Sequence, residues 1–229
     1  MRCRLVRQML SIVAFGALSA LTLAGPVQAQ VIDFESQAQD FYADGSSVTQ
    51  AGFSFTQIGD FGVIADSSSF FIAQAPQGSD GQFYSVLNDS QVALSRGDGV
   101  TFNLDGFDAG FVSPVPQDAG VVAGRLVLIG TKVGGMSFTT SFEFGASDDS
   151  GNFSFHHFAS GLGDFRNIAS VEFLACVYVA GGGCANPADN LAQFSLDNVG
   201  VTVVPEPSTY ALMALGLCGI AAYSRRARR

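Results

Sequence analysis

Carboxylates and histidines are the side chains of this chain that could carry out catalysis. Glycoside hydrolysis needs two carboxylates on either side of the scissile bond. Glu143 and Glu172 are available, each on the polar phase of an alternating segment, but nothing in the residues around them marks an acid and a base. The two histidines, His156 and His157, are adjacent, so in a regular strand they point to opposite faces and cannot bind one metal together. His157 is in phase with neighbouring phenylalanines and is expected to be a partly buried polar residue.

Serine chemistry and phosphate binding have no better support. The chain contains no Gly-x-Ser-x-Gly segment, which would present a nucleophilic serine on a sharp turn. No glycine-rich phosphate loop follows an expected strand. The residues therefore predict a protein without catalytic activity of its own.

The first 29 residues have the three-part order of a signal peptide. Arg2, Arg4 and Arg7 supply a positive start, residues 9–23 supply an apolar run, and the segment ends on small side chains at Ala29. This order is what translocation by the Sec machinery and cleavage by signal peptidase require. We expect a signal-peptide helix over residues 1–29, with cleavage after Ala29.

The last 25 residues form a second three-part signal. Pro205, Glu206 and Pro207 precede an uncharged apolar run at residues 211–222. Proline suits the first turn of a helix, since its missing N–H would have no partner there. A helix over residues 208–223 would be about 24 Å long, which makes it a short transmembrane helix for hydrocarbon about 30 Å thick. The arginines that follow hold that end in the cytoplasm; they are Arg225, Arg226, Arg228 and Arg229.

This C-terminal arrangement resembles the PEP-CTERM sorting signal of Gram-negative bacteria. The resemblance covers residues 205–229 and rests on Pro205, Glu206 and Pro207 together with the apolar helix and the arginine cluster. It implies that an exosortase in the inner membrane recognises the Pro-Glu-Pro segment and releases the protein to the surface. The domains expected are thus a signal peptide (1–29), an exported β domain (30–204) and a sorting signal (205–229).

Residues 30–204 are strongly acidic. They contain four of the 11 basic residues and 19 of the 20 acids, which gives a net charge near −15. Such a surface disfavours nucleic acid and anionic membrane as partners. Two cysteines, Cys176 and Cys184, lie in this segment with seven residues between them, including three glycines. Because an exported protein meets an oxidising compartment, we expect these cysteines to form a disulfide.

The segment between the two signals predicts strands. Met136, Phe138, Thr140, Phe142 and Phe144 alternate with polar residues, which is the period of a half-buried strand. Turn signals recur every 8 to 15 residues, as in an all-β antiparallel β-sandwich. In the last strand the apolar phase switches at Asp197 and Asn198, which predicts a bulge or bend there.

A weaker resemblance covers the β domain. The opening segment 31–35 and the closing segment 193–199 resemble strands of jelly rolls of the carbohydrate-binding-module type, and the pattern Gln193-Phe194-x-x-Asp197 resembles a subset of PEP-CTERM proteins. The resemblance implies that the first and last strands are neighbours and that acids on them hold a structural calcium. Asp33 and Glu35 are expected to share one face of the opening strand, and Asp197 lies at the predicted bend. The oxygen ligands of these three residues suit calcium.

Two functions remain open from the sequence. The first is an exosortase-processed surface or extracellular-matrix protein, structural or adhesive and non-catalytic, which passes through the inner membrane on its way to the outer surface. The alternative is a carbohydrate-binding module for exopolysaccharide, delivered by the same route, with Tyr42, Tyr84 and Tyr178 as candidate stacking platforms. No cofactor other than a structural calcium is expected.

Overall fold

The computed structural model describes residues 29–180, 183–204 and 207–227. The predicted signal peptide, apart from Ala29, lies outside these residues. The described residues divide into a β domain, Ala29–Val204, and a C-terminal tail that contains one helix, α2 (Pro207–Ala227). The first strand begins at Ala29, so a cut after Ala29 would leave residues 30–32 in place within it.

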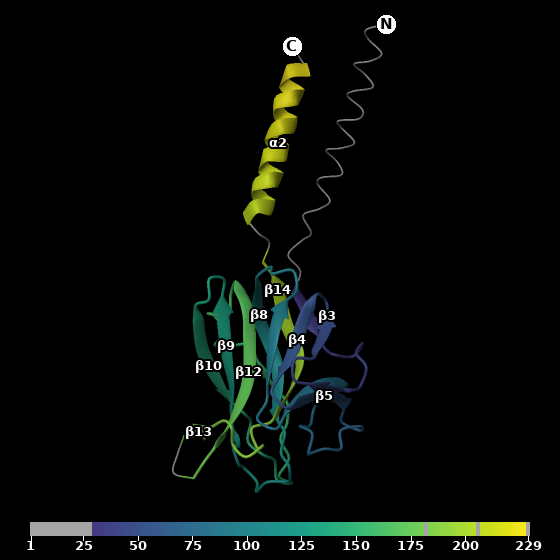
Figure 1. Ribbon diagram of the computed structural model, residues 1–229, viewed down its shortest axis with the longest axis vertical. Helices are drawn as coiled ribbons and strands as arrows, with labels where there is room; N and C mark the ends of the chain where they lie inside the picture. The colour runs from purple at the N-terminus through teal and green to yellow at the C-terminus, as the bar shows by residue number, and fades with distance from the viewer. Residues whose placement is uncertain (1–28, 181–182, 205–206, 228–229) are drawn as a thin grey trace. The chain divides into compact units, whose positions relative to one another are not determined.

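The β domain is built from strands that form a continuous antiparallel sheet folded into two layers (Figure 1). One layer contains β1 (Ala29–Ile32), β2 (Phe41–Ala43), β5 (Phe61–Asp66), β6 (Gln82–Leu87), β8 (Phe102–Phe111), β11 (His156–Phe158) and β14 (Phe194–Val203). The other contains β3 (Ser47–Gln50), β4 (Phe53–Ile58), β7 (Gln91–Arg96), β9 (Gly124–Lys132), β10 (Ser137–Glu143), β12 (Ile168–Tyr178) and β13 (Cys184–Ala185).

The order of the strands confirms the predicted antiparallel sandwich. The main path runs β2-β5-β6-β14-β8 in one layer and β12-β7-β4-β3 in the other. Between β8 and β12 the ladder consists of one pair, Phe102 with Ile168, so the sheet passes from one layer to the next at this point. The first and last strands, β1 and β14, are paired antiparallel as the jelly-roll resemblance implied.

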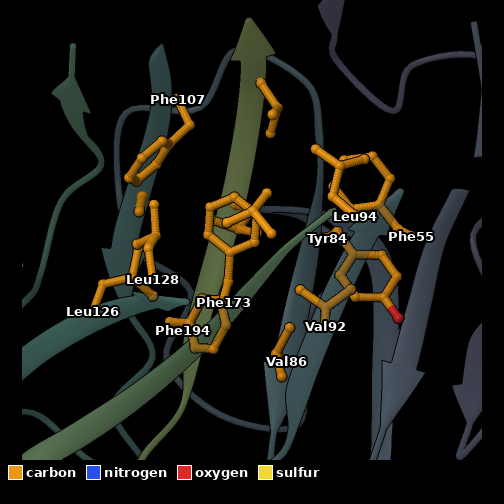
Figure 2. Packing of buried hydrophobic residues seen from close by; sticks show 14 of the residues in the cluster. Phe55, Tyr84, Val86, Val92, Leu94, Phe107, Leu126, Leu128, Phe173 and Phe194 are labelled. Carbon is orange, nitrogen blue, oxygen red and sulfur yellow. The ribbon is translucent and has the colours of Figure 1, made fainter. Parts of the chain in front are cut away.

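Phenylalanine fills the space between the layers. Figure 2 shows side chains of both layers meeting there, and the Phe107 ring lies 5.4 Å from the Phe173 ring in an edge-to-face contact. Alternation along β9 places Leu126 and Leu128 in this core and Arg125 outside it, because successive side chains of a strand point to opposite faces. Each fully buried aromatic or aliphatic side chain stabilises the fold by roughly 1.5–3 kcal/mol.

The last strand contains the predicted bulge. The register between β14 and β8 shifts between Asp197 and Gly200 and again before Val201. Asn198 has a left-handed backbone (φ 48°) and is exposed, whereas Asp197 and Val199 on either side are buried. Because the extra residue at the bulge has no partner on β8, the buried side chains before it, such as Phe194, and after it, such as Val199, follow different alternations along the strand.

One disulfide and one set of hydrogen bonds hold the loops near the C-terminal end of β12. Cys176 and Cys184 form the predicted disulfide, with their Cα atoms 5.3 Å apart. Asp89, in the turn after β6, accepts hydrogen bonds from three backbone N–H groups of the segment that leads into β14. The donors are Ala188 (3.0 Å), Asn190 (2.7 Å) and Ala192 (2.8 Å). One carboxylate thus anchors a loop about 100 residues away in the chain.

The opening strand is shorter than its sequence predicts. β1 ends at Ile32, and Phe34 has a left-handed backbone (φ 59°) with its ring fully buried against Phe55. Because the backbone turns at Phe34, the alternation assumed for residues 31–35 stops there. Asp33 and Glu35 therefore do not share a face of one strand, and this prediction was wrong.

Candidate functional site

The tail follows directly from the last strand of the β domain. β14 ends at Val203, and the N–H of Val204 donates to the carbonyl of Thr101 (2.9 Å), which fixes the end of the domain. Pro205 and Glu206 of the predicted processing motif lie outside the described residues, as do Arg228 and Arg229. Pro207 is the first residue of α2, the position where the missing N–H of proline costs nothing.

The helix of the tail presents apolar side chains without cover. Leu215, Leu217, Ile220 and Tyr223 are exposed, and Arg226 near the end of the helix is exposed too. Among the helices in the described part of the chain, none combines the length and the hydropathy needed to cross a membrane. The helix is thus present where the sequence places it, while the predicted membrane span is not confirmed.

The three acids proposed as calcium ligands do not come together as one set. The carboxylate of Asp33 accepts hydrogen bonds from Gln50 (2.8 Å) and from the backbone of Glu35 (3.2 Å). Glu35 turns away and accepts from the N–H of Gln82 (2.7 Å). No group of three or more His, Cys, Asp or Glu side chains is arranged to hold a metal ion within the described ranges. The calcium site therefore remains a prediction, and the positions of these three acids do not support it.

Asp197 is a buried acid at the bulge of β14. Its side chain accepts hydrogen bonds from Ser79 (3.0 Å) and from the N–H of Asn198 (2.7 Å). Burial raises the pKa of this carboxyl to about 6, and the negative charges of Asp108 and Glu35 add to the increase, while the two hydrogen bonds oppose it. Asp197 therefore holds its proton more tightly than an ordinary aspartate does.

A polar chain continues from this bulge onto the neighbouring strands. Asp108 on β8 accepts from the side chain of Asn198 (2.9 Å) and lies 2.7 Å from the Nδ1 atom of His157 on β11. The His157 side chain is 64% exposed, so the expectation that it is partly buried was wrong. The imidazole is largely exposed and the Asp108 side chain is 23% exposed, so water competes for this contact and it contributes little.

The candidate tyrosines have different environments. Tyr84 is fully buried and donates to Gln57 (2.9 Å) inside the core, so it cannot serve as a platform for a sugar ring. Tyr42 is partly buried and packs on Tyr84. Tyr178 is 37% exposed and is the tyrosine of the three that offers a ring to solvent.

Polar partners hold the ring of Tyr178 in place. Its hydroxyl donates to Glu143 (2.5 Å) and accepts from Arg125 (2.7 Å), whose guanidinium also lies 5.6 Å from the ring centroid. The hydrogen bonds from Tyr178 and then from Arg125 hold the pKa of Glu143 below its usual value. Glu143 is thus ionised and engaged, and Glu172 lies on β12 away from this group, so the two carboxylates do not form the pair a glycosidase needs.

A groove of about 220 Å³ lies beside Tyr178. Its walls come from the segment after β8, the segment before β9 and the end of β12. The lining residues are Phe111, Ser113, Pro114, Gln117, Val121, Val122, Ala123, Val177, Tyr178 and Leu191. Sequence reasoning missed this groove, because its residues are scattered over 80 positions and no local pattern links them.

A second hollow, of about 240 Å³, lies at the β2 edge of the other layer. Three apolar side chains at its rim are exposed: Phe41 (52%), Phe71 (82%) and Ile72 (39%). An exposed phenylalanine in isolation is ordinary, whereas three apolar side chains around one hollow form a surface that water covers poorly. The sequence did not single out these residues.

Comparison with known proteins identifies the tail. Residues 203–229 match the family model described as the PEP-CTERM protein-sorting motif. The chain therefore carries this sorting motif at its C-terminus, and the recognition made from Pro205, Glu206 and Pro207 is confirmed. Because the motif is generally recognised by an exosortase, the chain is an exported protein that an exosortase targets. No curated protein matches the chain.

Solved structures share features of the β domain. A DUF4465 family protein from Bacteroides caccae aligns at 11% identity and a TM-score of 0.49, covering 77% of this chain and 100% of that one. The carbohydrate-binding module CtCBM11 aligns at 15% identity and a TM-score of 0.30, covering 80% and 100%. TmCBM61, solved with β-1,4-galactotriose, aligns at 10% identity and a TM-score of 0.30, covering 76% and 94%. At these scores the likeness carries no functional information about this chain.

Proposed function

We propose that the protein is a non-catalytic structural or adhesive component of the cell surface or extracellular matrix of a Gram-negative bacterium, delivered by an exosortase. The observation that carries this proposal is the match of residues 203–229 to the PEP-CTERM protein-sorting motif. The β domain suits a durable surface component, since it combines a phenylalanine core, a disulfide and loops tied by Asp89.

The proposed route has two cuts. Signal peptidase removes the segment ending at Ala29 after Sec-dependent export. The tail then holds the protein at the inner membrane until the exosortase recognises Pro205, Glu206 and Pro207 and separates the β domain from the arginine-bearing end. Outside the cell the domain keeps the net charge near −15 of residues 30–204, which favours solubility and disfavours nucleic acid as a partner.

Glu206→Ala tests the processing motif. In a host that contains an exosortase, we expect the variant to stay in the inner membrane with its tail attached, while the wild-type β domain appears in the supernatant or outer-membrane fraction without the tail. Cell fractionation and mass spectrometry of the C-terminal peptide measure both outcomes. Asp149→Ala, which removes an exposed acid from a turn of the β domain, is the matched control and should be released normally. Unchanged release of Glu206→Ala would refute the role of this residue.

Glycan binding by the same exported domain is the alternative. The observation that favours it is the exposed ring of Tyr178, fixed by Glu143 and Arg125 at the rim of a groove, because a preorganised aromatic face suits stacking against a sugar. Retention on immobilised exopolysaccharide that is lost in Tyr178→Ala and kept in Tyr42→Ala would support this function. Equal retention of both variants would argue against a site at the groove.

A further inference from the structure

β10 is a long strand at an open edge of the sandwich. It pairs with β9 along its whole length without a register shift, and among the described strands β9 is its partner. Figure 1 shows β10 at the margin of its layer, outside β9. The edge strands β2 and β3 at the ends of the main sheet path have three and four residues, whereas β10 has seven. A long regular edge is a template for pairing with another strand.

The backbone groups that face outward from β10 can be assigned from the ladder. The N–H of Lys132 donates to the carbonyl of Met136 (2.9 Å), and the N–H of Phe144 donates to the carbonyl of Gly124 (3.1 Å). In an antiparallel strand each residue directs its N–H and its C=O to the same neighbouring strand, and successive residues alternate between the two neighbours. Because Met136 and Phe144 both bond to β9 or its ends, the backbone groups of the even-numbered residues between them face β9. The groups facing the open side belong to Ser137, Thr139, Ser141 and Glu143, whose side chains are exposed.

β10 also lacks the features by which edges are usually protected. Its sequence, SFTTSFE, contains no proline and no lysine, and such residues are common defences of exposed edges. Its charged residue, Glu143, is already engaged by Tyr178 and Arg125 of its own chain. The open edge is therefore neutral, although the domain as a whole is strongly acidic.

The strand is complementary to itself when reversed. An antiparallel pair centred on residue 140 places phenylalanine opposite phenylalanine and hydroxyl residues opposite each other, and at its two ends it places serine opposite glutamate. The facing residues would be Ser137 with Glu143, Phe138 with Phe142, Thr139 with Ser141, and Thr140 with Thr140. In this register the outward-facing residues meet as hydrogen-bonded pairs, giving about eight hydrogen bonds between the two strands. Moving the centre to residue 141 would place Phe142 opposite Thr140, and moving it to residue 139 would place Phe138 opposite Thr140. Either shift would leave an end residue of the strand without a partner in the facing strand.

The aromatic residues of β10 would gain from such a partner. Phe138 packs on Phe165 (4.8 Å between ring centroids) and Phe142 on Phe158 (5.2 Å), yet both remain only partly buried at the sheet margin. In the reversed pair these residues fall at the positions where side chains of facing strands come closest. Each half-exposed ring would thus be covered by the ring of the second copy.

From these observations we propose that β10 is a self-association edge through which two copies of this chain pair antiparallel, about a two-fold axis at Thr140. The pairing extends the β9–β10 layer of one copy into that of the other, as an isologous contact in which the same surface serves both partners. The contact is smaller than a standard interface of roughly 1,600 Å², so the dimer is weak in dilute solution and favoured where copies are concentrated on a surface. Because the net charge near −15 repels the second copy, added salt strengthens the dimer.

Charge variants test the register. The β domain, residues 29–204, has its own core and disulfide and can be produced alone by export to an oxidising compartment. Sedimentation over a concentration series should show a monomer–dimer equilibrium for the wild type. Thr139→Lys with Ser141→Lys places like charges opposite each other and should weaken dimerisation by about tenfold or more. Thr139→Lys with Ser141→Glu places opposite charges face to face and should restore it.

The matched control moves the same charge to another edge. Ser47→Lys with Thr49→Lys changes two exposed positions of β3 and should leave the dimer intact. A wild type that stays monomeric up to about 1 mM would overturn the proposal. Equal weakening by the β3 control would overturn it as well.

A cysteine scan gives a readout that is independent of the lysine variants. Thr140 lies on the proposed axis, where the two Cα atoms are about 4.5 Å apart, within the range a disulfide spans. Thr140→Cys should therefore form a covalent dimer on mild oxidation, whereas Thr139→Cys, which faces Ser141 rather than its own copy, should not. Equal cross-linking of the two variants would show that no defined register exists.

Discussion

Asp197→Asn provides the sharpest test of the electrostatics of the β domain. The side chain of Asp197 is 5% exposed, and its pKa is raised to about 6 from an ordinary value of 3.8, first by burial and then by nearby negative charge. Between these two values the folded state binds a proton that the unfolded state has released. Asp197 therefore makes the free energy of unfolding fall as the pH rises from about 4 to about 6, and contributes no further change above that range.

The size of this effect follows from the shift. Roughly two pKa units correspond to about 3 kcal/mol of unfolding free energy, present as a penalty at pH 7 and absent near pH 4. An asparagine carries no charge, and its amide can keep both contacts, since its oxygen accepts from the N–H of Asn198 and its NH₂ donates to Ser79. We expect Asp197→Asn to stabilise the domain by about 2–3 kcal/mol at pH 7 and by little at pH 4.

Urea unfolding of residues 29–204 at several values between pH 4 and pH 8 measures this difference. Subtracting the wild-type curve from the variant curve removes the contribution of exposed acids such as Asp148 and Glu143, whose lowered pKa values act in the opposite direction. Asp149→Asn is the control for the loss of one acid, because Asp149 is exposed and lies in a turn. A difference between Asp197→Asn and wild type that does not change between pH 4 and pH 7 would refute the reasoning.

Two further outcomes follow from the same domain. Asp89→Ala should lower the unfolding free energy by about 3 kcal/mol, since it leaves three backbone N–H groups of a distant loop without their partner. Asp148→Ala also removes three hydrogen bonds, but they lie within one exposed turn where water can replace them, so it should cost much less. Equal losses in denaturant titrations would contradict the long-range role of Asp89. The melting temperature of the β domain should be the same in calcium and in chelator, because no three-ligand group gathers within the described residues; a higher melting temperature in calcium would support the calcium prediction from the sequence instead.

The sequence predicted those features whose causes lie within a few residues of each other. Alternation along β10 depends on the period of two, which side chains of any strand obey. The disulfide of Cys176 and Cys184 needs a short loop that the chain itself provides. The change of phase at Asp197 records the bulge directly, because an inserted residue shifts every later side chain to the opposite face.

The candidate site was less predictable, because its contacts join distant parts of the chain. Asp33 and Glu35 were expected on one face, but the turn at Phe34 is imposed by burial of its ring in the core, which no local pattern records. Tyr84 and Tyr178 look alike in sequence, yet one is inside and the other outside. Their difference is decided by whether another layer covers the strand.

The sequence alone determined the sorting class of this protein and the class of its fold. The sorting motif is a linear segment that includes Pro205–Pro207, and local periodicity of apolar residues predicts strands. Both features can therefore be recognised without tertiary information. Only the tertiary structure decided which strand lies at an edge, which acid is buried and which tyrosine meets solvent. Those properties depend on strand order and layer packing, which arise from contacts between residues up to about 100 positions apart.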